Sequence, residues 1–359
     1  MILAVVLSAI VLIGWSLISD RLLPTSGPQT VQIEDGKAKP LPQPQADPTA
    51  DAPARLRNRA IVLAESPRVQ IRTPSLAGSI NLKGARIDDL VLVREREGLA
   101  KDSPPVRLLS PAGAPDAYFA GFGWSGEGAA TPPSDATWTA SAPVLSPGKP
   151  VTLSWTSPSG LRFEQIVSVD EGYLFTVKQR VANPTGNAVA VRPYGLISRA
   201  AKSPDPDGWT MHVGPMGYLN GAANYDVDWD TLDEAGANGE QFTSNGGWLG
   251  FTDKYWLTAL APAGNDSIAA SLRRASSGAY QADYARQPVM VPPGKAVTTD
   301  THLFAGAKEF DLLKSYENAG IPELSRAIDW GWFRFFMIPI FDLLLWVFKH
   351  VGNFGVAII

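Results

Sequence analysis

Alternation of apolar and polar residues from about position 60 to position 306 is the feature that most constrains the fold of this chain. In the run 172–182, phenylalanine and valines alternate with threonine, lysine and arginine, which gives a strand one buried face and one wet face. Similar short runs are separated by clusters of Pro, Gly, Asn and Ser. The sequence therefore predicts a mainly β fold, with an antiparallel β-sandwich at residues 58–307.

Individual strands are predicted at 151–156, 161–169, 172–182, 188–197, 248–260, 268–273, 279–284 and 297–304. The turn residues Asn183 to Asn187 predict a hairpin between the strands 172–182 and 188–197. A helix is expected at 308–319, because Phe310, Leu313 and Tyr316 share one side of it and Gly320 ends the periodic run.

The chain begins with an apolar run. Ile2 to Ile18 are 17 residues without a charge, and about 26 Å of helix is just enough to cross the hydrocarbon core of a bilayer. No basic residue precedes the run and residues 19–22 make a poor cleavage site, so an uncleaved transmembrane anchor at 1–19 is favoured over a cleavable signal peptide. Residues 20–57 contain seven prolines and predict an extended, disordered linker.

The C-terminal part, 308–350, is predicted to be helical and to include an amphipathic helix that starts at Pro339 and ends near Lys349. About 12 residues, roughly 18 Å, are too few to span a bilayer. Asp342 and Lys349 form one narrow polar stripe, so we expect this helix to lie in the membrane interface; a core helix of a soluble domain is the alternative. The predicted membrane-interface residues are Trp330, Trp332, Phe333, Phe341, Asp342, Leu344, Trp346 and Lys349. Residues 351–359 have the pattern of a second spanning helix that is only beginning.

No local motif supports catalysis, a metal or a cofactor. The 31 basic and 35 acidic residues give a net charge of −4, which argues against nucleic-acid binding, and cysteine is absent. Gly121 to Gly126 has the dinucleotide-binding spacing without a following helix, so a glycine-rich loop is expected. Asp226 to Asp230 lacks the glycine and glutamate of a calcium loop and is expected on a strand face or surface loop. His212, His302 and His350 are far apart in sequence, and no serine-nucleophile motif accompanies them.

Several segments closely resemble the bacterial YidC insertase family, also called the YidC/Oxa/Alb family. They are 78–90 (GSINLKGARIDDL), 217–221 (GYLNG), 246–256 (GGWLGFTDKYW), 328–333 (IDWGWF), 339–341 (PIF) and 351–355 (VGNFG). The resemblance covers nearly the whole chain apart from the linker, and its parts come in the family's order.

The resemblance implies a membrane protein insertase and chaperone of the bacterial inner membrane, which performs no covalent chemistry and needs no cofactor. It also implies a first helix with its N-terminus in the cytoplasm, a periplasmic β-supersandwich, an interfacial amphipathic helix and then a helical core. The groove arginine of that core would fall beyond Ile359. The implied partners are the lipid bilayer, nascent membrane proteins and, for some clients, the Sec translocon.

A different class of function remains open on the same residues. A membrane-anchored periplasmic domain that binds carbohydrate or peptide is the alternative, because the supersandwich is shared with mutarotase-like proteins by fold analogy. Such enzymes need an acid–base pair that converges on one sheet face, and three scattered histidines do not favour this. An adaptor of an export pump would carry long heptad repeats, and the sequence contains none.

Overall fold

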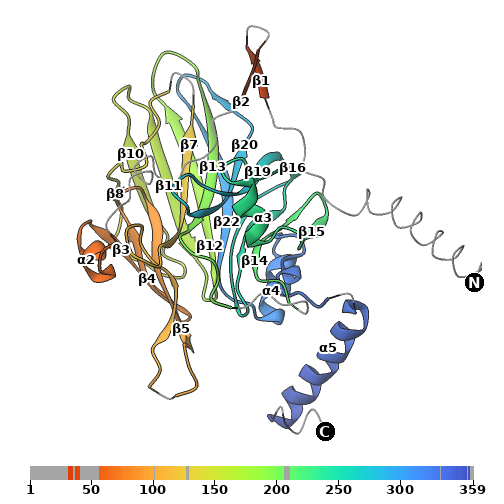
Figure 1. The fold of residues 1–359 in the computed structure, drawn as a ribbon. Helices are drawn as coiled ribbons and strands as arrows, with labels where there is room; N and C mark the ends of the chain where they lie inside the picture. Colours follow the sequence, from red (N-terminus) through yellow and green to blue (C-terminus); the bar gives the residue numbers. More distant parts are fainter. Residues whose placement is uncertain are drawn as a thin grey trace, which may run out of the picture.

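The computed structural model describes residues 31–34, 37–40, 56–100, 102–126, 129–205, 211–331, 333–353 and 355. The predicted anchor at 1–19 lies outside these residues, as do most of the predicted linker and residues 356–359. Within these ranges, no helix is both long enough and apolar enough to cross a bilayer. The described part of the chain is mainly β, as predicted, and its strands form two large sheets (Figure 1).

The first large sheet has nine strands. In spatial order they are β15 (Ala222–Asn224), β14 (Gly214–Leu219), β17 (Trp248–Thr252), β18 (Trp256–Pro262), β22 (Lys295–Ala307), β12 (Leu174–Asn183), β11 (Arg162–Val169), β10 (Val151–Thr156) and β8 (Thr139–Ala140). Their pairings are antiparallel, which matches the predicted sheet type.

The second large sheet has eleven strands. Its spatial order is β16 (Glu240–Asn245), β19 (Ser267–Arg274), β20 (Tyr280–Arg286), β13 (Val189–Arg199), β7 (Tyr118–Ser125), β5 (Arg86–Arg96), β4 (Leu76–Asn81), β3 (Arg68–Arg72) and β9 (Val144–Leu145), with β21 (Val289–Val291) beside β13 and β6 (Pro105–Leu109) beside β5. The short β9 runs parallel to β3. A separate hairpin, β1 (Val31–Glu34) and β2 (Lys37–Pro40), lies within the predicted linker.

The two large sheets pack on one apolar core. The rings of Trp124 in β7 and Phe163 in β11 lie 5.1 Å apart across the interface between the sheets. A buried amide also crosses it, because Gln179 Nε2 in β12 donates to the Gly123 carbonyl in β7 at 2.7 Å. Buried amides need such partners, so these polar contacts fix how the sheets sit on each other.

The strand β12 has the predicted alternation, with its apolar residues at 175, 177 and 181 buried. The predicted hairpin at 183–187 is wrong. β12 pairs with β11 and β22 in one sheet, whereas β13 pairs with β7 and β20 in the other. The Asn183 side chain accepts from Thr185 N and donates to the Val291 carbonyl, which stabilises a crossover between sheets. Alternation along one strand determines its buried face but not its neighbour.

Two further expectations for strands and loops need correction. The run 248–260 is two strands, β17 and β18, which pair with each other after a turn at residues 253–255. The glycine-rich segment 121–126 lies mostly in the buried strand β7 and not in a loop. Glycine is needed there because a Cβ at Gly123 would lie 2.6 Å from the Tyr194 hydroxyl.

The described helical elements are α2 (Arg59–Ala64), α3 (Trp229–Ala235), α4 (Phe310–Asn318), the 3-10 helix η2 (Leu324–Ala327) and α5 (Arg334–Val351). The predicted helix at 308–319 is confirmed as α4, with Leu313 and Tyr316 buried. Asp226 and Asp228 lie in a loop, as expected, whereas Asp230 lies in the first turn of α3, because Asp228 Oδ1 caps that helix by accepting from Thr231 N at 2.7 Å. In Figure 1, α4 lies at one end of the sheets and α5 projects from that end.

The helix α5 starts before Pro339 and has 18 residues, whereas the sequence predicted a start at Pro339 and about 12 residues. Proline inside a helix removes one hydrogen bond to the carbonyl four residues earlier. Here that carbonyl belongs to Phe335, whose residue is 81% exposed, so water can replace the missing donor. The first turn still closes, because Met337 N donates to the Phe333 carbonyl at 3.0 Å.

Candidate membrane-interface site

The segment that leads into α5 is tied to the β domain, beginning with α4. Tyr316 donates its hydroxyl hydrogen to Asp170 Oδ2 at 2.6 Å, and its oxygen accepts from Tyr173 N at 3.1 Å. The Tyr316 ring also packs edge-on against Phe304 of β22 at 5.9 Å. Since Leu313 is also buried, α4 is part of the domain core and not a loose appendage.

The next stretch, 321–327, is held by three hydrogen bonds to its backbone carbonyls. Trp248 Nε1 donates to the Pro322 carbonyl at 3.0 Å, and Tyr225 donates to the Arg326 carbonyl at 2.8 Å. Lys308 Nζ lies 3.3 Å from the Ala327 carbonyl and 2.9 Å from Thr252 Oγ1. The chain is therefore fixed up to three residues before Trp330.

Burial lowers the pKa of Lys308 to about 8, against an ordinary value of 10.5. Between these values the unfolded chain binds a proton that the folded chain has lost, so this group makes stability rise with pH in that window. We expect the free energy of unfolding of the wild type, minus that of Lys308→Met, to increase between pH 8 and pH 10. Chemical denaturation across this range measures the difference, with Lys254→Met as an exposed control. A difference that does not change with pH would contradict the prediction.

The three histidines have structural roles. His212 N donates to Asp329 Oδ2 at 3.1 Å, and His212 Nε2 bonds to the Pro215 carbonyl at 2.8 Å. His302 Nδ1 lies 3.1 Å from Thr176 Oγ1, and His350 Nδ1 lies 2.8 Å from a carbonyl of its own helix. Across the described ranges, no group of three His, Asp or Glu side chains is placed to hold a metal ion.

One side of α5 contacts the domain. The Trp330 ring lies 5.6 Å from Phe310 of α4 and 5.1 Å from Phe341 of α5, and Phe310 and Phe341 are 5.6 Å apart. These three residues form what we call the aromatic clamp. Near the other end of the helix, Lys349 Nζ pairs with Asp311 Oδ2 of α4 at 2.9 Å.

The other side of α5 is apolar and exposed. No residue of α5 is buried, and Leu343 and Trp346 are each 60% exposed. This outward face consists of Phe335, Phe336, Ile340, Leu343 and Trp346. A helix with apolar residues on the side away from its own domain needs another apolar environment for them.

The predicted interface residues are divided between these two sides. Trp330 and Phe341 belong to the aromatic clamp, Leu344 is half-buried, and Lys349 pairs with α4. The exposed members are Phe333, Asp342, Trp346 and also Lys349, and Trp332 lies outside the described residues. The predicted interface residues did not include the outward residues Phe335, Phe336, Ile340 and Leu343. Ile340 and Leu343 already lie within the predicted helix, whereas extending the helical period back to Arg334 through the proline would have found Phe335 and Phe336.

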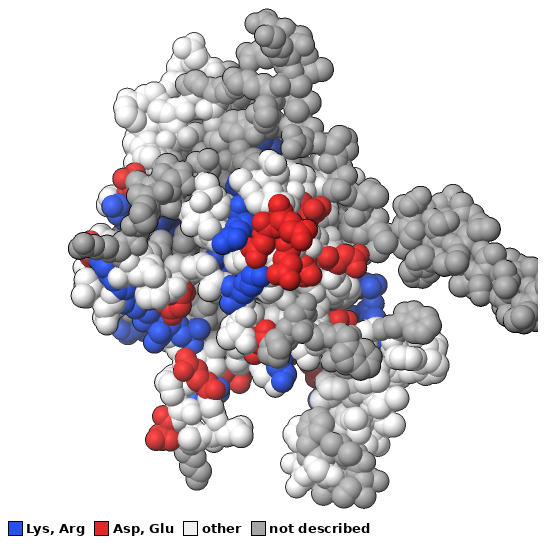
Figure 2. All heavy atoms as spheres, viewed as in Figure 1, with Lys and Arg blue, Asp and Glu red and all other residues white. Residues whose placement is uncertain are grey.

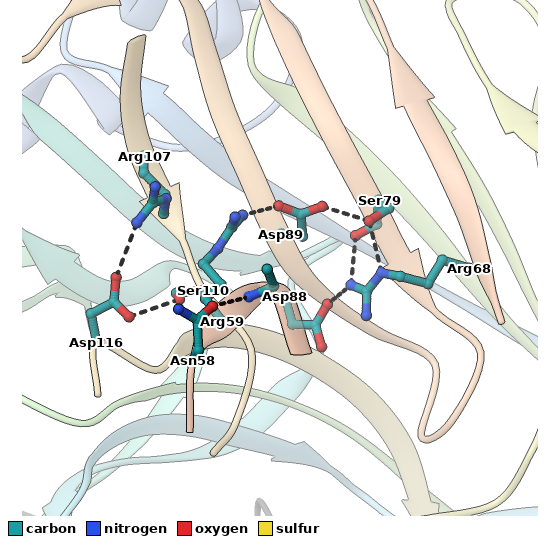
Figure 3. A network of polar contacts seen from close by, with 10 residues as sticks. Asn58, Arg59, Arg68, Ser79, Asp88, Asp89, Arg107, Ser110 and Asp116 are labelled. Carbon is teal, nitrogen blue, oxygen red and sulfur yellow. Dashed lines mark hydrogen bonds and ion pairs between the residues drawn. The ribbon is translucent and has the colours of Figure 1, made fainter. Parts of the chain in front are cut away.

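A polar cluster lies where the chain enters the domain, around α2 (Figure 3). Arg59 pairs with Asp89, whose other oxygen accepts from Ser79 Oγ at 2.6 Å. Arg68 pairs with the buried Asp88 and donates to Ser79 Oγ at 2.8 Å. Burial raises the pKa of Asp88, although the charge of Arg68 opposes this. The cluster joins α2 to β3, β4 and β5, so its role is structural.

Acidic side chains gather over α3, beside basic ones (Figure 2). Asp230 and Asp233 pair with Lys202 at 2.7 and 2.9 Å, and Asp233 also pairs with Arg274 at 3.1 Å. A hydrogen bond from Tyr280 and another from Lys202 lower the pKa of Asp233. Asp230 and Asp233 are therefore paired with neighbouring cations, whereas the part of α5 visible in the same view carries no charge colour.

A small pocket opens beside β7 and β13. Its lining includes Arg86, Trp138 and Tyr194, but it contains no histidine and no carboxylate. The acid–base pair needed for sugar epimerisation is therefore not present in this pocket.

Two packed, mostly antiparallel sheets that continue into a helix with an outward apolar face define a large β domain with an attached amphipathic helix. A family model described as the YidC periplasmic domain matches residues 68–343. The chain belongs to this family.

Curated relatives agree with the family model. The membrane protein insertase YidC of Zymomonas mobilis is 42% identical over 362 residues, which cover 100% of this chain and 62% of that protein. The protein of the same name from Acidiphilium cryptum is 42% identical over 320 residues, which cover 84% of this chain and 53% of that protein. The chain thus spans only part of these relatives, with 62% and 53% of their lengths covered.

Among solved structures, a galactose mutarotase related enzyme from Lactobacillus acidophilus has a TM-score of 0.43 and 9% sequence identity, with 66% of this chain and 97% of that chain covered. A putative aldose 1-epimerase from Escherichia coli K12 has a TM-score of 0.40 and 11% identity, with 66% and 98% covered. Similarity at this level supports no conclusion about sugar chemistry.

Proposed function

We propose that the whole protein is a membrane protein insertase and chaperone of the bacterial inner membrane. In this proposal residues 1–19 anchor the chain, 20–57 link the anchor to the domain, and 58–307 form a periplasmic β-supersandwich. Membership of the YidC periplasmic-domain family supports this, as do relatives named membrane protein insertases. Its partners are the lipid bilayer and nascent membrane proteins, and it acts alone or beside the Sec translocon.

The observation that carries the proposal for this chain is the outward apolar face of α5. Apolar side chains gain about 1.5–3 kcal/mol each when fully removed from water, and tryptophan favours the boundary between headgroups and acyl chains. The predicted stripe of Asp342 and Lys349 lies between the outward face and the domain, where it can stay in water. The helix thus has the properties of one that lies in the plane of the membrane surface.

In this role the protein forms no covalent intermediate. Its contribution is to hold the helix α5 at the periplasmic surface of the membrane. The helix that follows in the full-length protein then enters the bilayer at a defined position. A polar cavity within a helical core then lowers the free-energy cost of moving polar client segments across the bilayer. Ionisable groups at membrane depth commonly line such substrate pathways.

The full-length protein, reconstituted into vesicles, tests the proposal with a short single-span client. We expect protease to leave the membrane-inserted part of the client intact only when the protein is present. Equal protection in protein-free vesicles would contradict the insertase proposal. Adding purified Sec translocon as a separate arm measures whether the two act together.

A further inference from the structure

The helix α5 is attached to the β domain at two points along its length. The aromatic clamp of Phe310, Trp330 and Phe341 holds its N-terminal half, and the pair of Lys349 with Asp311 holds its C-terminal end. Phe341 and Lys349 are eight residues apart, or about 12 Å along the helix. Two contacts at this separation define both the direction of the helix axis and its rotation about that axis.

The rotation determines which apolar residues face away from the domain. Successive residues of an α-helix turn by about 100°, so Leu343 points about 160° and Trp346 about 140° away from the direction of Phe341. Both side chains are 60% exposed, whereas Phe341 and Leu345 on the domain side are half-buried. Because α5 is apolar on both sides, its own composition does not select one side for lipid.

We infer that the β domain, through the aromatic clamp and the Asp311–Lys349 pair, fixes the rotation of α5 so that only the outward face meets lipid. Phe310 is then a positioning residue that acts through Trp330 and Phe341 on the depth and angle of α5. This inference rests on the proposed function, since it assumes that α5 lies on a bilayer. It adds that the rotation of the helix is set from the domain and not by the lipid.

Site-directed spin labelling tests the inference, because this chain has no cysteine of its own. Single cysteines replace Leu343 on the outward side or Leu345 on the domain side of the full-length protein, in which any cysteine outside this chain is changed to serine. The labelled protein is placed in vesicles of phosphatidylethanolamine and phosphatidylglycerol. Relaxation by oxygen, which concentrates in lipid, reports lipid contact at each site. We expect several-fold more relaxation at position 343 than at position 345.

Loss of the clamp is expected to remove this contrast. In Phe310→Ala the ratio of oxygen relaxation at position 343 to that at position 345 should fall towards one. Phe310→Tyr should keep the ratio, because the tyrosine ring can occupy the place of the phenylalanine ring. Near-ultraviolet circular dichroism checks that the domain remains folded. Two charge reversals give a second route: Asp311→Lys or Lys349→Asp alone should lower the ratio at low ionic strength, and the two together should restore it.

The outcomes separate the inference from the proposed function. If neither position contacts lipid, α5 is not at the membrane, and both the interfacial role and the clamp are wrong. If both positions contact lipid equally in the wild type, the helix is interfacial but the domain does not set its rotation. An unchanged ratio in Phe310→Ala, or no rescue by the double charge reversal, would also overturn the inference.

Discussion

The double substitution Ile340→Asp with Leu343→Asp is expected to release α5 from the bilayer and to abolish client insertion while the β domain stays folded. Both residues lie on the outward face of α5 and are more than half exposed, so the domain loses little packing. Each apolar side chain contributes up to about 3 kcal/mol when buried in an apolar environment, and a carboxylate reverses that gain. A combined loss of about 3 kcal/mol lowers occupancy of the interface by about 100-fold.

A fluorescent probe attached to the cysteine of a Trp346→Cys variant measures the release of α5 from the bilayer. A probe is needed because the chain has eleven tryptophans, so its intrinsic emission does not report on α5 alone. The emission should shift to that of a water-exposed probe in the double variant, and insertion of the client should fall with it. The matched control is Ile61→Asp with Leu99→Asp, which changes two exposed apolar residues elsewhere on the domain and adds the same charge. Normal insertion by the α5 variant, or an equal defect in the control, would contradict the prediction.

Removal of one partner of the buried pair Arg199–Asp253 is the second large expected effect. The guanidinium of Arg199, at the end of β13, donates to both carboxylate oxygens of Asp253 at 3.0 and 2.8 Å. It also lies over the rings of Tyr118, at 4.8 Å, and Trp229, at 5.6 Å. Both charged side chains are about 90% buried, so Asp253→Ala would leave a cation without a partner away from water.

We expect Asp253→Ala to lower the free energy of unfolding by about 3–5 kcal/mol, because an uncompensated buried charge costs far more than the pair contributes. Glu65→Ala serves as the control, since Glu65 pairs with Arg57 and both side chains are close to half exposed. Such a pair contributes about 1 kcal/mol or less. Denaturant titration followed by near-ultraviolet circular dichroism measures both variants. Similar effects of the two substitutions would show that burial does not determine the role of Arg199.

The candidate site was only partly predictable. Trp346 was expected at the interface and lies on the outward face, and the polar pair Asp342 and Lys349 was expected on one stripe. Phe341 was expected on the membrane side too, but it packs against Phe310 and Trp330. Nothing in the helix sequence distinguishes its two apolar sides, so a contact with α4 was needed to assign them. That contact involves Phe310, some thirty residues earlier in the chain.

The sequence by itself determined the mainly β class, the alternating faces of strands such as β12, and the helix α4 with its buried Leu313 and Tyr316. These features depend on residues within one or two turns or along one strand, where periodicity reports burial directly. Only the tertiary structure decided that β12 and β13 lie in different sheets and which side of α5 turns outward. Both depend on contacts between residues far apart in the chain, and local patterns do not encode which distant surface will cover an apolar face.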